Sequence, residues 1–326
     1  MKIEKIRIEK IGNQYRVRKQ IRGKKITLTF DHEPDTIEIA EALATHDPSV
    51  KGTFEACAKA YIASKSNVLS PSTLRGYNAI LRTMDEDFKQ LPIAKITQID
   101  IQRTINERAA EHKAKTARNL HGFISAVLRQ YRPSMRIYTT LPKQEQIEYY
   151  TPSEDDIQKI LEASEDRPFY HIPFQLGIMS LRRSEICALT VDDIKDNILT
   201  INKAMVMDTD SHWIINHYNK SEAGTRKIYI PQKLVDEIQA QGFIYEGNPG
   251  SILDGLNRYQ DKLGMPRFRF HDLRHFYASY AHSMGISDAD IMATGGWKSD
   301  FTMKRVYRHE MKAKESQQTV FDKIIK

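Results

Sequence analysis

Apolar residues recur along this chain with two different periods, and the first region follows the period of a strand. Apolar and polar positions alternate through residues 3–30 and are interrupted by a turn at 22–24. Alternation places successive side chains on opposite faces of a strand, so this region predicts two strands of a small sheet. The apolar positions on either side of the turn are Tyr15, Val17, Ile26, Leu28 and Phe30.

Residues 51–135 follow the period of a helix instead. Four segments place apolar residues three or four positions apart, which predicts four amphipathic helices. Thr53 precedes the first segment as an N-cap, and either Ser70 or Ser72 precedes the second. The four segments are 53–66, 70–88, 97–113 and 115–131. Residues 136–150 show neither period, so we expect a linker there.

Helical and strand-like segments mix in residues 151–326. A capped helix begins after Thr151 or Ser153, and short β-like runs lie between about 197 and 231. Residues 271–284 read as a helix. Its expected core positions are Leu273, Phe276, Tyr277, Tyr280 and Met284. The fold class predicted for the whole chain is multidomain and mainly α with small β-sheets: a β-rich region 1–50, a four-helix region 51–135, a linker 136–150 and a mixed α+β region 151–326.

Charge separates these regions further. The chain carries a net +7, and residues 1–30 and 51–140 each carry +8, whereas the rest is acidic overall. Such basic regions suit a polyanion such as nucleic acid, although a merely solvated surface is an equally good reading of charge alone. Only two cysteines are present, and no segment reads as a signal peptide or membrane helix. We expect a reduced, cytoplasmic protein.

The candidate chemistry lies in the segment HDLRH at 271–275. His271 and Arg274 are three residues apart and therefore neighbours on one helix face, where they can converge on one ligand. A guanidinium matches the geometry of phosphate oxygens, and an imidazole can accept a proton. His271 and His275 have the spacing of zinc ligands, but the glutamate of the zinc-binding HExxH motif is absent. We expect no metal and no cofactor.

Five short motifs occur in one order: RRSE at 182–185, NKSEAGTRKIYIP at 219–231, HDLRH, GGWKS at 295–299 and VYRH at 306–309. This set resembles the tyrosine recombinases, the phage integrase family of site-specific DNA recombinases. The resemblance implies an arm-binding domain at 1–50, a core-binding domain at 51–135 and a catalytic domain at 151–326. The short apolar tail of this chain, at 318–325, resembles the segment that such proteins dock onto a neighbouring subunit.

The resemblance also assigns the catalytic residues. They are Arg182, Lys220, His271, Arg274, Trp297 and Tyr307. Arg183 remains an alternative to Arg182, because Met179 and Ser180 stand where the family often has Thr-Gly. Lys203 and Lys227 remain alternatives to Lys220.

In this assignment Tyr307 attacks a DNA phosphate and forms a 3′-phosphotyrosyl bond. The two arginines stabilise the charge that develops on the phosphate oxygens, and the indole N–H of Trp297 adds a donor. His271 takes the proton of the phenol, and Lys220 protonates the departing 5′ oxygen. The bond energy is conserved, so no ATP is needed, and no phosphate-binding P-loop occurs in the sequence.

DNA-contacting candidates lie in both basic regions. In the N-terminal sheet they are Arg16, Arg18, Lys19, Arg22, Lys24 and Lys25. In the helical region they are Thr73, Arg75, Lys113, Lys115 and Arg118. The expected partners are double-stranded DNA, three further copies of the chain in a tetramer, and accessory factors of the excisionase and host DNA-bending types. A type IB topoisomerase and a DNA-binding regulator with an inactive site are the rival interpretations.

Overall fold

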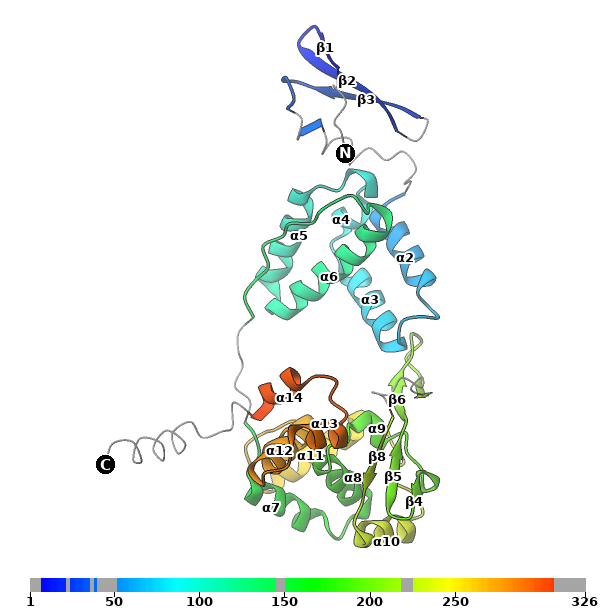
Figure 1. Ribbon diagram of the computed structural model, residues 1–326, viewed down its shortest axis with the longest axis vertical. Coiled ribbons are helices and arrows are strands. Elements are labelled where there is room, and N and C mark those ends of the chain that lie inside the picture. Colours follow the sequence, from blue (N-terminus) through cyan, green and yellow to red (C-terminus); the bar gives the residue numbers. More distant parts are fainter. Residues whose placement is uncertain are drawn as a thin grey trace, which may run out of the picture. The chain divides into compact units, whose positions relative to one another are not determined.

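The computed structural model describes residues 7–21, 24–35, 38–39, 52–144, 150–217 and 225–307 (Figure 1). Contacts within the chain divide it into two units, 1–146 and 147–326. The chain is mainly helical and carries small antiparallel sheets, which confirms the predicted fold class.

The N-terminal sheet has three strands rather than two, in the order β1-β2-β3. They are β1 (Ile8–Ile11), β2 (Gln14–Ile21) and β3 (Lys24–Phe30). Val17 pairs with Leu28, and both are buried together with Ile26 on one face, as the alternation predicts. The additional strand β1 is only four residues long, too short for its alternation to stand out in the sequence.

The next region is a helical bundle with its own apolar core. Its main helices are α2 (Phe54–Ser64), α3 (Pro71–Thr83), α5 (Gln98–Glu111) and α6 (Ala114–Tyr131), joined by the short α4 (Glu86–Gln90) and η1 (Ile93–Lys95). Thr53 accepts a hydrogen bond from the backbone N–H of Ala56, and Ser70 from that of Thr73. These caps satisfy N–H groups that the first turn of a helix leaves unpaired, and Ser70, not Ser72, is the N-cap of α3.

Part of the segment expected as a linker lies on this bundle. Met135, Ile137 and Leu141 pack against its core. The side chain of Gln102 is hydrogen-bonded to the backbone of Thr140, and Arg118 Nε donates to the carbonyl of Pro142. Residues 145–149 lie outside the described part of the chain.

The second unit surrounds α8 (Pro168–Ile178), an apolar helix that contacts α7, α10, α11 and α12 (Figure 1). A helix that is apolar on all sides belongs in a core. Its neighbours are α7 (Glu154–Ser164), α10 (Gln232–Gln241), α11 (Pro249–Lys262) and α12 (Phe270–Ser283). Ser153, not Thr151, is the N-cap of α7, in a capping box with Asp156.

The described part of this unit also contains two small antiparallel sheets and three further helices. One sheet has the order β4-β5-β8, and β6 pairs with β7 in the other. The strands are β4 (Ile194–Lys195), β5 (Ile198–Ile201), β6 (Lys203–Met207), β7 (Trp213–His217) and β8 (Arg226–Tyr229). The helices are α9 (Arg183–Ile186), α13 (Asp288–Gly295) and α14 (Asp300–Tyr307), and the 3-10 turn η2 (Val191–Asp193) precedes β4.

The prediction of which residues of α12 face the core is wrong at the C-terminal end of the helix. Leu273 is fully buried, but Tyr280 and Met284 are 42% and 66% exposed. The buried positions of α12 are Phe270, Asp272, Leu273, Arg274, Ala278 and Ala281. Met303 of α14 is buried in one cluster with the two alanines, whose small side chains let a neighbouring helix approach closely. The sequence pattern had placed the bulky side chains inward and Arg274 on another face.

Candidate active site

Arg182 lies at the start of α9 and is anchored to Glu185 one turn later. Its backbone N–H donates to Glu185 Oε2 at 2.8 Å, and its Nη1 donates to Oε1 at 2.7 Å. Ser180 precedes it with a φ of 75°, in the left-handed region that glycine favours. The family pattern often has glycine at this position, and serine adopts the same conformation here.

Arg274 is the central cation of the site and is only 1% exposed. Its Nη1 donates to the Ser180 carbonyl at 2.8 Å, to the Ser180 hydroxyl at 3.1 Å, and to the Gly295 carbonyl. Its Nε and Nη2 find no hydrogen-bond partner among the described residues. Leaving a buried donor unpaired costs about 1–3 kcal/mol, and more for a charged group. These two N–H groups are therefore suited to an anion that is not part of the chain.

Trp297 covers one face of this guanidinium. The centroid of an indole ring lies 3.6 Å from Arg274 Cζ, a cation–π contact. Gly295 lies under the same ring, because a Cβ there would stand 1.9 Å from Trp297 Cζ3. Trp297 thus fixes Arg274 with the face of its ring, a contact separate from the N–H donation that the sequence suggested.

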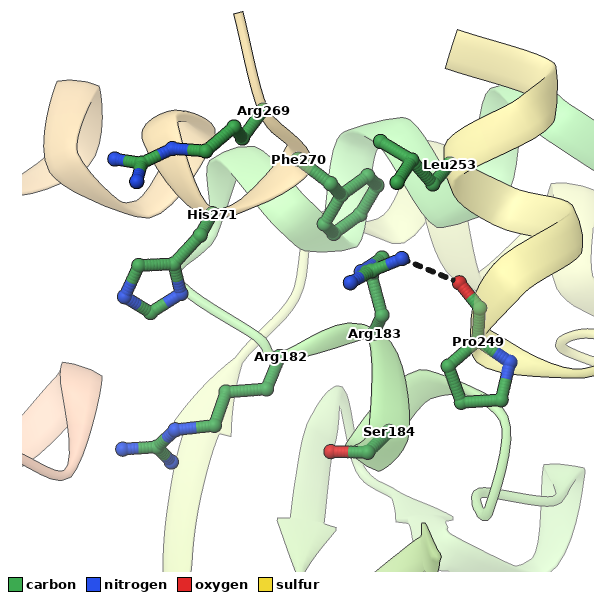
Figure 2. Close-up of a pocket in the computed structure, with 8 residues that line it drawn as sticks. All are labelled: Arg182, Arg183, Ser184, Pro249, Leu253, Arg269, Phe270 and His271. Carbon is green, nitrogen blue, oxygen red and sulfur yellow. Dashed lines mark hydrogen bonds between the residues drawn. The ribbon is translucent and has the colours of Figure 1, made fainter. Parts of the chain in front are cut away.

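His271 and Arg182 line one pocket of about 550 Å³ (Figure 2). The other lining residues are Arg183, Ser184, Pro249, Leu253, Arg269 and Phe270. Figure 2 shows the side chains of Arg269, His271 and Arg182 extending toward the same side. Arg269 is paired with Asp272, with Nη2 2.6 Å from Oδ1. The pocket is strongly basic and is large enough for a phosphodiester with its neighbouring sugars.

The charge states of His271, which lines this pocket, and of the nearby buried Arg274 favour proton transfer and anion binding. Loss of water around the ring, followed by the neighbouring His275, Arg274 and Arg182, lowers the pKa of His271 to about 4. His271 is therefore neutral at pH 7 and able to accept a proton. Burial, then the charges of Arg182 and Arg226, lowers the pKa of Arg274 to about 9, so its guanidinium remains charged.

The side chains of two of the six catalytic candidates are not described by the structure. Lys220 lies outside the described residues, and Tyr307 is described only as the last backbone position of α14. Met303, four residues earlier, is fully buried with Ala278, Ala281 and Ile291 and so anchors α14 to α12 and α13.

Two of the three alternative residues have partners of their own. Arg183 donates to the carbonyl of Pro249 at 2.8 Å (Figure 2). Lys203 is ion-paired with Asp193 at 2.8 Å, and Lys227 lies exposed on β8.

The structure adds a residue that the sequence did not single out. Arg226, the first residue of β8, has a side chain only 8% exposed and forms an ion pair with Glu185. Arg226 lies in the motif NKSEAGTRKIYIP, which is one of the five motifs that carry the family resemblance. A basic residue at a strand end is usually solvated, and nothing in the local pattern marked this one as buried.

The candidate DNA-contacting residues are mostly exposed. Arg16 and Arg18 alternate with Val17 on β2 and therefore lie on the face opposite the buried one, whereas Lys19 shares the face of Val17. Arg22 lies outside the described residues, and Lys24 and Lys25 are described only as backbone of β3.

In the helical bundle, Arg75, Lys113 and Lys115 are exposed. The Thr73 hydroxyl lies 2.9 Å from the Ser70 hydroxyl within the cap of α3. Lys113 precedes α6 without a side-chain cap, so the backbone N–H groups of that first turn have no capping side chain.

The described ranges contain neither a membrane-spanning helix nor a cluster of metal ligands. No helix there is both long and apolar enough to cross a membrane. No group of three or more His, Cys, Asp or Glu residues there has the arrangement of a metal site.

Two models of known protein families match parts of this chain. Residues 54–131 match the phage integrase central domain, and residues 153–314 match the phage integrase family. No curated protein sequence matches the chain.

Solved structures match at low sequence identity. The Tn1549 transposon integrase in complex with a circular intermediate DNA superposes with a TM-score of 0.67 at 15% identity, over 83% of this chain and 99% of that one. A lambda integrase dimer bound to a COC′ core site gives 0.60 at 17% identity, over 96% and 98%. A lambda integrase tetramer bound to a Holliday junction gives 0.58 at 19% identity, over 90% and 92%. These likenesses show the fold.

Proposed function

Because this chain belongs to the phage integrase family of tyrosine recombinases, we propose that its basic pocket holds one DNA backbone phosphate for attack by Tyr307. The protein is a site-specific DNA recombinase of the kind that phages and mobile elements use. The observation that carries the assignment is the pair of unpartnered donors on Arg274, buried beside Arg182 and His271.

Arg182 and Arg274 neutralise the phosphate. The Nε and Nη2 donors of Arg274 bind its non-bridging oxygens, whose charge increases as the fifth bond to phosphorus forms. Arg182, with a side chain 39% exposed to the pocket, provides the second guanidinium. Trp297 keeps Arg274 in place through the face of its ring.

His271 and Lys220 move the protons. A phenol has a pKa near 10 and attacks poorly until its proton is removed. Neutral His271 accepts that proton while the Tyr307 oxygen bonds to phosphorus. The bond from phosphorus to the 5′ oxygen breaks, and Lys220 protonates that oxygen. The chain is then linked to the 3′ phosphate, and the reverse steps join a new 5′ hydroxyl.

A suicide DNA substrate, in which the short released fragment that bears the new 5′ hydroxyl diffuses away, tests this proposal. The wild-type chain is expected to accumulate a covalent DNA adduct, and Tyr307→Phe is expected to bind the same DNA without forming one. Tyr280→Phe is the matched control, because Tyr280 lies exposed on α12. Tight DNA binding by the wild type without any adduct would instead support the regulator interpretation.

Double-stranded DNA is the partner that we assign to the exposed basic residues of both regions. The relatives in the solved structures are bound to DNA, and one of them is a tetramer on a Holliday junction. We assign the same tetramer to this chain, in the cytoplasm, with excisionase-type and DNA-bending factors as accessory partners. Deleting the apolar tail 318–325, which lies outside the described residues, should weaken assembly on paired sites more than binding to one site.

A further inference from the structure

Arg226 joins two parts of the active site that are far apart in the sequence. Its Nη1 lies 3.0 Å from Glu185 Oε1, and its Nη2 lies 2.9 Å from Oε2, so the guanidinium grips both carboxylate oxygens. Its Nε donates to the carbonyl of Thr294 at 2.8 Å. One side chain therefore connects α9, which begins after Arg182, with the end of α13, which leads to Trp297.

The turn after α13 is shaped to receive this side chain. Gly296 has a φ of 67°, in the left-handed region. A Cβ at Gly296 would lie 3.2 Å from Arg226 Cδ and 3.3 Å from its Nη1, so a larger residue would press on the guanidinium. The carbonyl of Gly295 in the same turn accepts from Arg274. This turn therefore contacts both Arg226 and Arg274, and a shift of the turn would move both side chains.

Glu185 shares its charge between two arginines. It is fully buried, which by itself raises the pKa of a carboxyl group, but the hydrogen bonds and charge of Arg226 and the charge of Arg182 lower the pKa of Glu185 to about 2. The fork from Arg226 contacts both oxygens, whereas the side chain of Arg182 donates to Oε1 alone at 2.7 Å. Arg182 Nη2 makes one further, longer hydrogen bond of 3.4 Å to the carbonyl of Gly296, and the Arg182 side chain lines the pocket (Figure 2).

We propose that Arg226 is a positioning residue for DNA cleavage: by holding Glu185 and the Thr294 carbonyl, it leaves Arg182 available to the phosphate. Without Arg226, the ionised Glu185 would draw the guanidinium of Arg182 onto both of its oxygens and away from the pocket. The turn at 294–297 would also lose a link to α9 that is shorter than the 3.4 Å hydrogen bond from Arg182 to the Gly296 carbonyl. The inference rests on the proposed function, but Arg226 itself contacts no substrate in this scheme.

The test compares Arg226→Met with the wild type in single-turnover cleavage of the suicide DNA. Misplacing a catalytic group by about 1 Å costs roughly 10²-fold in rate, and we expect a loss of that order with DNA affinity nearly unchanged. Arg226→Lys, which keeps the charge without the fork, should recover part of the rate. Arg267→Met is the matched control, since Arg267 forms an exposed two-point pair with Asp261.

A second substrate separates positioning from folding. In a methylphosphonate, a methyl group replaces one non-bridging oxygen and removes the negative charge that Arg182 is placed to neutralise. The loss caused by Arg226→Met should therefore be several-fold smaller on a scissile methylphosphonate than on the phosphate. A variant that is merely misfolded would lose the same factor on both. A 5′-phosphorothiolate, whose leaving group needs no proton, should give no comparable recovery.

Several results would overturn the inference. One is that Arg226→Met cleaves the phosphate substrate at the wild-type rate. Another is that its cleavage rate falls by the same factor on the phosphate and the methylphosphonate. A third is that its cleavage rate recovers on the phosphorothiolate and not on the methylphosphonate. If Arg226→Met fails to fold, the double variant Arg226→Met with Glu185→Gln removes the buried carboxylate charge that Arg226 no longer balances. That variant leaves Arg182 without its charged anchor and should show the same selective recovery. Absence of any adduct with the wild type would instead refute the proposed function itself.

Discussion

The helical bundle and the second unit, which we call the catalytic unit, each bury an arginine, and the two arginines have different roles. Arg132 in the bundle is 3% exposed, and its Nη1 donates to the carbonyls of Ile93 and Ile96. Arg274 in the catalytic unit is 1% exposed, and its Nη1 likewise donates to carbonyls. Burial lowers the pKa of both. By burial and backbone partners alone, they are alike.

Their surroundings separate them. Only desolvation acts on the pKa of Arg132, whereas Arg274 also feels the charges of Arg182 and Arg226. Among the fully buried donor atoms that lack a partner in the described residues are Nε and Nη2 of Arg274, whereas Arg132 contributes its Nε. Placing like charges together costs free energy that the fold does not recover without an anion. The comparison teaches that a buried cation marks a reaction site when other cations accompany it.

The strongest test of this difference replaces Arg274 with lysine. The charge is retained, but the planar fork that can bind two oxygens of a phosphate is lost. We expect single-turnover cleavage to fall by roughly 10²–10³-fold, as when one donor to a developing oxyanion is removed. DNA binding, measured by a gel-shift titration, should change far less. A parallel fall of cleavage and binding would contradict the assigned role.

The second test asks whether the surroundings of Arg274 also control its neighbour. His271 acts as a base only when neutral, and its lowered pKa of about 4 keeps it neutral well below pH 6.5. The second-order rate constant for cleavage, which reports the free enzyme, should therefore show no loss from His271 down to about pH 5. A histidine with the usual pKa would have lost roughly 30-fold there. An acidic limb near pH 6.5 that disappears in His271→Ala would refute this prediction.

The third test applies to the arginine of the bundle. Arg132→Met removes charge-assisted hydrogen bonds to two carbonyls, and we expect a loss of about 1–3 kcal/mol in the free energy of unfolding. Urea unfolding followed by circular dichroism measures it. The folded variant should form the covalent adduct at the wild-type rate, because Arg132 contributes only to packing. A selective loss of cleavage in a stable Arg132→Met variant would break the contrast between the two arginines.

The smallest expected effect concerns an exposed cation. Lys115 lies at the start of α6, and Lys115→Ala should remove at most one phosphate contact. The slope of log K against log salt for DNA binding should then decrease by about one unit. Lys262→Ala, at the end of α11, is the comparison variant, and it should leave the slope unchanged. Equal slopes for the wild type and both variants would remove Lys115 from the DNA-contacting set.

The sequence by itself determined the helical bundle, the order of the motifs and the position of each N-cap to within two residues. Thr53, Ser70 and Ser153 act through residues three positions away, and the apolar stripe of a helix is equally local. His271 and Arg274 were recognised as neighbours for the same reason. The third strand of the first sheet was missed, because four residues give too little alternation to stand out.

Only the tertiary structure decided which arginines are buried and what they hold. Arg274 meets Ser180 across 94 positions, and Arg226 meets Glu185 across 41 and Thr294 across 68. No local period records such contacts, because they depend on how α9, α12, β8 and the turn after α13 pack around one point. The motifs therefore named most of the residues that we propose hold the phosphate, and packing alone revealed the arginine that would keep one of them in position.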